Sequence, residues 1–164
     1  MIEQYQNHWF SVIKDGDFHY IKENGSENGA VVLVESEENY IFILVRRAAH
    51  LFREQIEAPR GYGEFNESSY DTAIREVFEE TGYTIERNQL EKLGAIKPNS
   101  AILASVVDVF YARISESQLT GIPDREVEGC IKIPKITIRE KIRNGVISDS
   151  FTLSAFAFLW SKYP

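Results

Sequence analysis

Three glutamates with helical spacing are the residues of this sequence best suited to chemistry. Glu76, Glu79 and Glu80 stand at positions i, i+3 and i+4, so in a helix their carboxylates project from one face within reach of a shared cation. Crowding of negative charge is costly without a counterion, and hard divalent cations such as Mg²⁺ prefer oxygen ligands. The spacing therefore predicts a metal site.

A solvated helix surface is the alternative interpretation of these glutamates. Neighbouring glutamates are common on exposed helix faces, and Arg75 can pair with Glu79 at i+4 without any further role. For an isolated Arg-Glu-x-x-Glu-Glu run this alternative is the commoner outcome. The residues around the run decide between the two.

The helix that carries the glutamates has clear end signals. Ser68 is followed three residues later by Asp71, which is a capping-box signature, and Gly82 stands where a left-handed C-terminal cap falls. These signals predict a helix over about residues 69–81. Val77 lies at an angle suited to packing, so the acidic face is left free to line a cleft.

The segment from Gly61 to Tyr83 resembles the Nudix box at every fixed position. Tyr83 is aromatic where the family more often has an aliphatic residue, which affects packing more than chemistry. With roughly 7% usage for each fixed residue, a chance match is on the order of 10⁻⁶ over the chain. The fixed residues are Gly61, Glu67, Arg75, Glu76, Glu79, Glu80 and Gly82.

The resemblance implies a loop, helix and loop that bind one or more Mg²⁺ ions, with Mn²⁺ as a second possible metal. The ligands would be Glu76, Glu79 and Glu80, joined by the main-chain carbonyl of Arg60. Such ions neutralise a pyrophosphate, polarise its phosphorus and lower the pKa of a bound water for in-line attack.

The resemblance also implies supporting roles in the box. Arg75 is expected to hold the glutamates in position without touching substrate, and Glu67 to brace the loop. Gly61 and Gly82 are expected to be structural.

Residues upstream of the box resemble the ADP-ribose and nucleotide-sugar branch of the family. The segment 57–61 matches the Glu-x-Pro-x-Gly lead-in of that branch, and Arg46 and Arg47 resemble its strand-end arginines, which contact the phosphates of the substrate. An arginine donates bidentate hydrogen bonds to phosphate, although a surface role is the alternative for either one.

Two downstream features also resemble that branch. Pro98 lies sixteen residues after Gly82, the spacing of the ADP-ribose subgroup, but the glycine that often follows is replaced by Asn99-Ser100-Ala101. In several relatives a glutamate before the late strand acts as catalytic base or extra metal ligand. A gap-free match back from Gly145 favours Glu126, strand alternation also admits Glu128, and a solvated charge cluster is the alternative.

The remaining elements predict an α/β fold. Ranges 9–13 and 18–21 flank the hairpin signal Asp15-Gly16, and with 30–34 and 40–45 they give four strands before the first helix. A long strand is expected over 102–112 and a short one over 130–133. Thr137 with Glu140 opens a short helix that stops at Gly145, and Asp149 or Ser150 opens the last helix. We expect the Nudix α/β/α sandwich, with a mixed sheet and the loop-helix-loop of the box.

Composition sets the remaining bounds. The 164 residues, 43% of them hydrophobic, predict a single domain over 1–164, and no apolar run approaches the roughly 18–20 residues that span a bilayer. We expect a cytoplasmic protein in which Cys130 is ordinary core. The net charge of −7 disfavours a nucleic-acid partner. A homodimer is expected, with the N-terminal strands 1–24 as candidates for its interface.

The leading hypothesis is Mg²⁺-dependent hydrolysis of a nucleoside diphosphate linked to another moiety, either ADP-ribose or a nucleotide sugar. The products would be a nucleoside monophosphate and a sugar phosphate. The alternatives are a nucleoside triphosphate or a dinucleoside polyphosphate, and Pro98 disfavours the latter. A nucleotide sensor without turnover is a third hypothesis, but such domains usually lose box glutamates and none is missing here.

Overall fold

A mixed seven-stranded sheet forms the centre of the computed structural model, which describes residues 1–125 and 127–164. The main strand order is β10-β5-β4-β9-β8, with β4 and β9 parallel. Two short strands, β6 and β7, pair with β5 and β4. The strand bounds are β4 (Ala30–Ser36), β5 (Asn39–Arg46), β6 (Glu54–Glu57), β7 (Arg60–Gly61), β8 (Leu90–Ile96), β9 (Val107–Ile114) and β10 (Gly129–Pro134).

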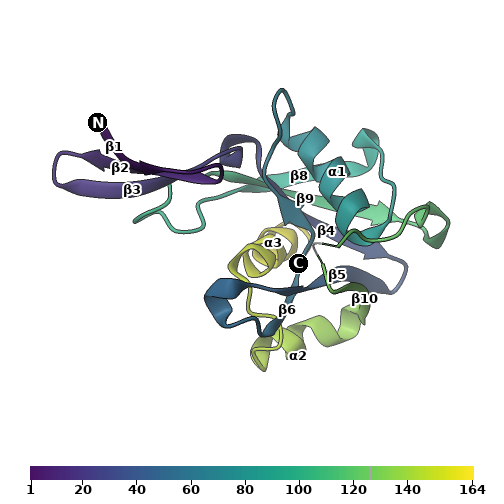
Figure 1. Cartoon of the computed structure of the whole chain (residues 1–164). Coiled ribbons are helices and arrows are strands. Elements are labelled where there is room, and N and C mark those ends of the chain that lie inside the picture. Colours follow the sequence, from purple (N-terminus) through teal and green to yellow (C-terminus); the bar gives the residue numbers. More distant parts are fainter. Residues whose placement is uncertain (126) are drawn as a thin grey trace.

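Helices cover both faces of this sheet (Figure 1). Alternate residues of β4 point to opposite faces, so Val31 packs in one core cluster with Phe156, while Val32 packs in another with Val77. The first cluster lies under α3 (Ser150–Lys162), which follows the short α2 (Ile138–Arg143), and the second lies under α1 (Ser69–Thr81). The expected α/β/α sandwich with a mixed sheet is confirmed.

The helix α1 has the bounds and caps that its sequence predicts. The Ser68 side chain accepts from the Asp71 N–H, and the Asp71 side chain accepts from the Ser68 N–H, which closes the capping box. Gly82 ends the helix at φ 76°, where a Cβ would also lie 2.5 Å from the Gly121 carbonyl oxygen. These caps fix the two ends of α1, and the packing of Ala73 and Val77 against the sheet fixes which face is buried.

A separate three-stranded sheet precedes the main one. Its strands, β1 (Ile2–Gln6), β2 (Phe10–Asp15) and β3 (Phe18–Glu23), pair antiparallel in that order and project from the body of the molecule (Figure 1). The turn between β2 and β3 contains Gly16 at φ 60°, as the Asp15-Gly16 signal predicts. We call these strands the N-terminal sheet.

Three expectations about the elements are wrong. More than four strands precede α1, because β1, β6 and β7 are present; β1 is exposed along its whole length, so no apolar face marks it in the sequence. The long strand starts only at Val107, since the residues before it form turns against β3, and β8 was not anticipated. Thr137 does not cap α2 with its side chain, because its own backbone is already helical (φ −94°, ψ −9°) at the end of the 3-10 turn Lys135–Thr137. Its hydroxyl donates to the Pro134 carbonyl.

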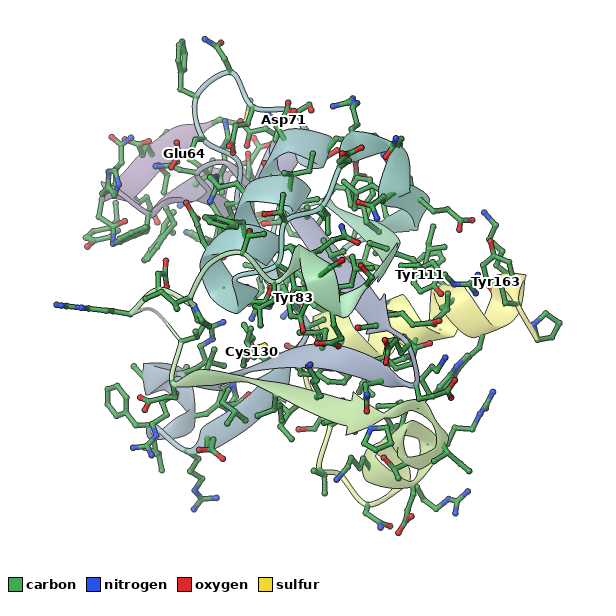
Figure 2. All side chains as sticks on the ribbon, turned by 90° about the vertical axis from the view of Figure 1, so that its right-hand side faces the viewer. Glu64, Asp71, Tyr83, Tyr111, Cys130 and Tyr163 are labelled. Atoms are coloured by element: carbon green, nitrogen blue, oxygen red, sulfur yellow. The ribbon has the colours of Figure 1, made fainter. Side chains whose placement is uncertain are left out.

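Two further features follow the sequence. Asp149 caps α3, its carboxylate accepting from the Thr152 N–H at 2.8 Å. Cys130 is half-buried and packs against the core under α1 (Figure 2). Within the described residues, none of the helices has the length and hydropathy needed to cross a bilayer.

Candidate metal and phosphate site

The guanidinium of Arg75 lies among the acidic residues of the segment 61–83 and holds them together through hydrogen bonds. Its Nε and Nη2 donate to the two oxygens of Glu67 at 2.9 and 3.0 Å. Its Nη1 donates to Glu76 at 2.7 Å and to Glu79 at 2.9 Å, and Nη2 also donates to the carbonyl of Tyr62 at 2.9 Å. All five N–H groups of the side chain are therefore used inside the protein. We call this group the Arg75 cluster.

The loop before α1, residues 60–67, is drawn tightly onto the helix, and we call it the box loop. The N–H of Arg60 donates to Glu80 Oε2 at 2.8 Å. A Cβ placed on Gly61 would lie 1.9 Å from Glu76 Oε1, so only a glycine lets the carboxylate approach the chain here. Glu64 in this loop and Asp71 in the first turn of α1 mark its position in Figure 2.

Glu80 is the most buried of the helix glutamates, with 7% of the residue exposed. Burial raises the pKa of its carboxyl to about 8, and the neighbouring Glu76 also raises it, against the opposing effects of Arg60 and Arg47. The ionised form of a buried acid next to a second carboxylate is costly unless a cation compensates its charge.

A hard divalent cation fits these residues by donor chemistry. The carboxylate of Glu80 accepts from the Arg60 N–H, and that of Glu76 lies against Gly61. A cation bound here would supply the positive charge that offsets the buried Glu80 carboxylate. Within residues 1–125 and 127–164, no three His, Cys, Asp or Glu side chains are already arranged as a metal site. In this arrangement Glu76 and Glu79 are both paired with the Arg75 guanidinium.

A second set of charges lies on the other side of Glu80 and is centred on Glu57. This residue is 1% exposed, and its carboxylate accepts from Arg47 at 2.7 and 3.4 Å and from Arg60 Nη2 at 3.0 Å. Arg47 keeps 39% of its side chain exposed. The buried acid thus orients an arginine that still reaches solvent. In the sequence, Glu57 stands out only as part of the lead-in, and no local pattern marks its two arginine partners.

The N-terminal end of α3 supports the Arg60 side chain. Its Nη2 lies 3.9 Å from Asp149 Oδ1, and its guanidinium carbon lies 4.3 Å from the Phe151 ring centroid. Thr152 accepts from the Ala58 N–H at 2.9 Å and donates to Asp149 at 2.8 Å. The final helix is therefore tied to the lead-in segment, and the sequence gave no signal for this contact beyond the Asp149 cap.

The other site residues proposed from the sequence are Arg46, Pro98, Glu126 and Glu128, and none of the three that the structure describes is hydrogen-bonded to the Arg75 cluster. Arg46 is exposed and its Nε lies 3.9 Å from Glu128 Oε1, so these two residues pair with each other. Pro98 is half-buried in the turn after β8. Glu126 lies outside the described residues. The preceding segment does reach α1, because the Asp124 N–H donates to the Glu79 carbonyl at 2.8 Å.

Comparisons with known proteins place this geometry in a family. Residues 26–144, more than half of the chain, match the family model described as NUDIX domain. The chain is also 28% identical over 138 residues to a protein named ADP-ribose pyrophosphatase from Bacillus subtilis (strain 168), covering 82% of this chain and 73% of that relative. The family range contains the box loop, α1 and the Arg75 cluster, whereas the N-terminal sheet and α3 lie outside it.

Replacing Glu80 by Gln should make the protein more stable than the wild type when no metal is present. With metal present, the wild type should gain stability that the variant does not. Because the folded-state pKa is raised from 4.5 to about 8, wild-type stability falls as pH rises through this window, and Gln removes that cost while still accepting from Arg60. At pH 8 in a chelator, we expect Glu80→Gln to melt higher by roughly 2–4 °C. Adding Mg²⁺ should raise the Tm of the wild type and leave the variant unchanged. Calorimetry showing an equal Mg²⁺ shift in both proteins would contradict the metal assignment.

Gly61→Ala should displace the Glu76 carboxylate and weaken metal binding by about tenfold or more, since the new Cβ meets this carboxylate. Titration with Mn²⁺, followed by electron paramagnetic resonance, measures the change. Gly129→Ala is the matched control, because a Cβ there has nothing within 4 Å. Equal Mn²⁺ affinities for the two variants would show that the close approach at Gly61 does not matter.

Proposed function

The chain belongs to the Nudix family, and from that premise we propose that it is a Mg²⁺-dependent pyrophosphohydrolase acting on ADP-ribose or a nucleotide sugar. It is a hydrolase of phosphorus anhydrides. The finer assignment would give a nucleoside monophosphate and a sugar phosphate as products. The name of the Bacillus subtilis relative supports ADP-ribose as substrate, and so does the Glu57–Gly61 lead-in. The observation that carries the proposal is the intact Arg75 cluster next to the buried Glu80.

In this proposal Glu76, Glu79 and Glu80, with the Arg60 carbonyl, hold the metal. When bound, Mg²⁺ or Mn²⁺ neutralises the pyrophosphate and lowers the pKa of a water that attacks phosphorus. Arg75 positions Glu76 and Glu79 and has no N–H left for the substrate, because each is already donated within the protein.

The supporting roles follow from close approaches. Gly61 gives room to Glu76, and Glu67 holds the box loop by accepting from both Arg75 and the Glu64 N–H. Gly82 ends the helix beside Gly121. These residues act on the metal ligands and not on the substrate.

Arg47 is the group proposed to bind the phosphates. One edge of its guanidinium is occupied by Glu57, which leaves the opposite N–H groups to a phosphate on the exposed side. Arg46 and Pro98 are weaker proposals, since Arg46 pairs with Glu128 and Pro98 shapes a turn. Glu126 and Glu128 both stay candidates for the catalytic base.

A substrate panel tests the proposed reaction. With Mg²⁺ present, ADP-ribose or a nucleotide sugar should be cleaved with a higher kcat/KM than nucleoside triphosphates or dinucleoside polyphosphates, as measured by release of phosphomonoesters. Glu80→Gln should lower kcat by about 10²-fold or more, because it removes a metal-ligand charge. Glu38→Gln, at a glutamate with 92% of its side chain exposed, is the control and should retain full activity.

The panel separates the competing functions. Preference for a triphosphate or a dinucleoside polyphosphate would overturn the substrate assignment but not the metal site. Tight nucleotide binding without turnover of any substrate would instead identify a sensor.

We also propose that the whole chain, 1–164, works as one unit in the cytoplasm, where nucleotide metabolites occur, and assembles as a homodimer through the N-terminal sheet. Large apolar side chains are exposed on these strands and on the turn between β1 and β2, and such exposure favours an interface. They are Ile2, Tyr5, Trp9 and Phe18.

Light scattering after size exclusion tests the dimer. The wild type should elute at twice the 18.8 kDa chain mass, and Trp9→Ser with Phe18→Ser should shift it to the monomer mass, because polar side chains remove the apolar contact. Ile136→Ser, at an exposed residue of the main body, should leave the dimer intact. A monomeric wild type, or dissociation by the control alone, would contradict the proposed interface.

A further inference from the structure

Tyr62 joins the N-terminal sheet to the box loop through its side chain. Its hydroxyl donates to Glu23 Oε2 at 2.8 Å, and Glu23 is the last residue of β3. The hydroxyl of Ser105, which is fully buried, donates to the same oxygen at 2.5 Å. Burial raises the pKa of the Tyr62 hydroxyl well above its usual range, and the bond to Glu23 adds to this, so the hydroxyl remains a donor.

The main chain of Tyr62 makes the second half of this connection. Its carbonyl accepts from Arg75 Nη2 at 2.9 Å, and Nη1 of the same guanidinium holds Glu76 and Glu79. A single residue therefore lies between the end of β3 and the arginine that orients the helix carboxylates.

The chain that leaves the N-terminal sheet is packed against the box loop without free space. The Gly63 N–H donates to the Gly25 carbonyl at 2.9 Å, and a Cβ on Gly25 would lie 2.3 Å from the Gly63 oxygen. A Cβ on Gly63 would lie 2.6 Å from the Cβ of Asn28. The two backbones therefore approach too closely to admit a side chain at either glycine, and close packing of this kind transmits displacement from the end of β3 to the box loop.

The segment before β9 holds β3 from its other side. The Ile21 N–H donates to the Ile102 carbonyl at 2.7 Å, and the Ala104 N–H donates to the Ile21 carbonyl at 2.9 Å. Ser105 follows directly and reaches Glu23. The end of the N-terminal sheet is thus fixed between this segment and Tyr62, while its far end projects from the body (Figure 1).

We propose that Tyr62 is a positioning residue that connects the N-terminal sheet to the box loop. Through this connection, the position of the end of β3 affects the turnover rate. The inference deepens the proposed function and rests on it for its kinetic consequence. In this role Tyr62 has no contact with the substrate. It acts through its bonds to Glu23 and Arg75.

Tyr62→Phe removes only the hydroxyl and tests the connection directly. We expect kcat to fall by about fivefold to tenfold, with the KM for substrate changed by less than about twofold and a higher Mg²⁺ concentration needed for half-maximal rate. Tyr111→Phe is the matched control, because the buried Tyr111 hydroxyl also donates to a glutamate, Glu35, at 2.7 Å. Figure 2 shows Tyr111 beside Tyr163, well separated from Glu64 of the box loop. The control should lose similar stability and keep its kcat.

Variants of Glu23 distinguish a specific bond from general loosening. Glu23→Gln still offers an oxygen to Tyr62 and Ser105 and should retain nearly all of kcat, whereas Glu23→Ala should reproduce the loss in Tyr62→Phe. The double variant Tyr62→Phe/Glu23→Ala should lose no more than the larger single loss, because both remove the same connection. Multiplied losses in the double variant would overturn the proposal.

Amide hydrogen exchange at Gly63 tests the connection without any substrate. Its N–H is bonded to Gly25, so exchange should be faster by about tenfold in Tyr62→Phe and unchanged in Tyr111→Phe. If the wild type cleaves nothing in the substrate panel but Gly63 responds in this way, the proposed function fails and the coupling holds. An unchanged exchange rate at Gly63, or a kcat in Tyr62→Phe no lower than in the control, would overturn the coupling.

Discussion

The guanidinium of Arg75 opposes the mutual repulsion of the box carboxylates, and the arrangement of the site depends on it. Three glutamates and one main-chain carbonyl accept its five N–H groups, so a single cation fixes the box loop to α1. Planar, forked donors suit this task, whereas the three donors of a lysine could not satisfy all of these acceptors at once. Glu80 is left outside the cluster, buried and with a raised pKa. The same interaction therefore holds the box loop, Glu76 and Glu79 together and leaves Glu80 without a bond to Arg75.

A second group of paired charges lies near the Arg75 cluster. Glu57 is buried between two arginines, and Arg60 in turn contacts the N-terminal end of α3 through Asp149 and Phe151. A buried carboxylate of this kind stabilises little by itself, but removing one partner would leave an uncompensated charge. The arrangement gives specificity of position: Arg47 keeps one face bound to the protein and the other open. The fold thus places two arginines, Arg47 and Arg60, near enough to Glu80 to oppose the rise in its pKa.

Local features of the sequence predicted the helix that carries the candidate site, and distant contacts could not be predicted. The capping box of Ser68 and Asp71, the cap at Gly82 and the i, i+3, i+4 spacing all lie within one helix, where periodicity is informative. The bond of Tyr62 to Glu23 spans 39 residues, and that of Ser105 to Glu23 spans 82. No periodic pattern encodes such pairs. Strand β1 has no apolar alternation to mark it, because every residue is exposed. The capping signature at Thr137 is not realised, because the backbone there is already helical.

A structure of the protein grown with Mn²⁺, with the metal located by its anomalous scattering, tests the central claim most directly. We expect a peak bound by the carboxylates of Glu76 and Glu80 next to the main chain of Arg60, with Arg75 still paired to Glu67. No peak at this position, or a metal bound only at another set of carboxylates, would contradict it.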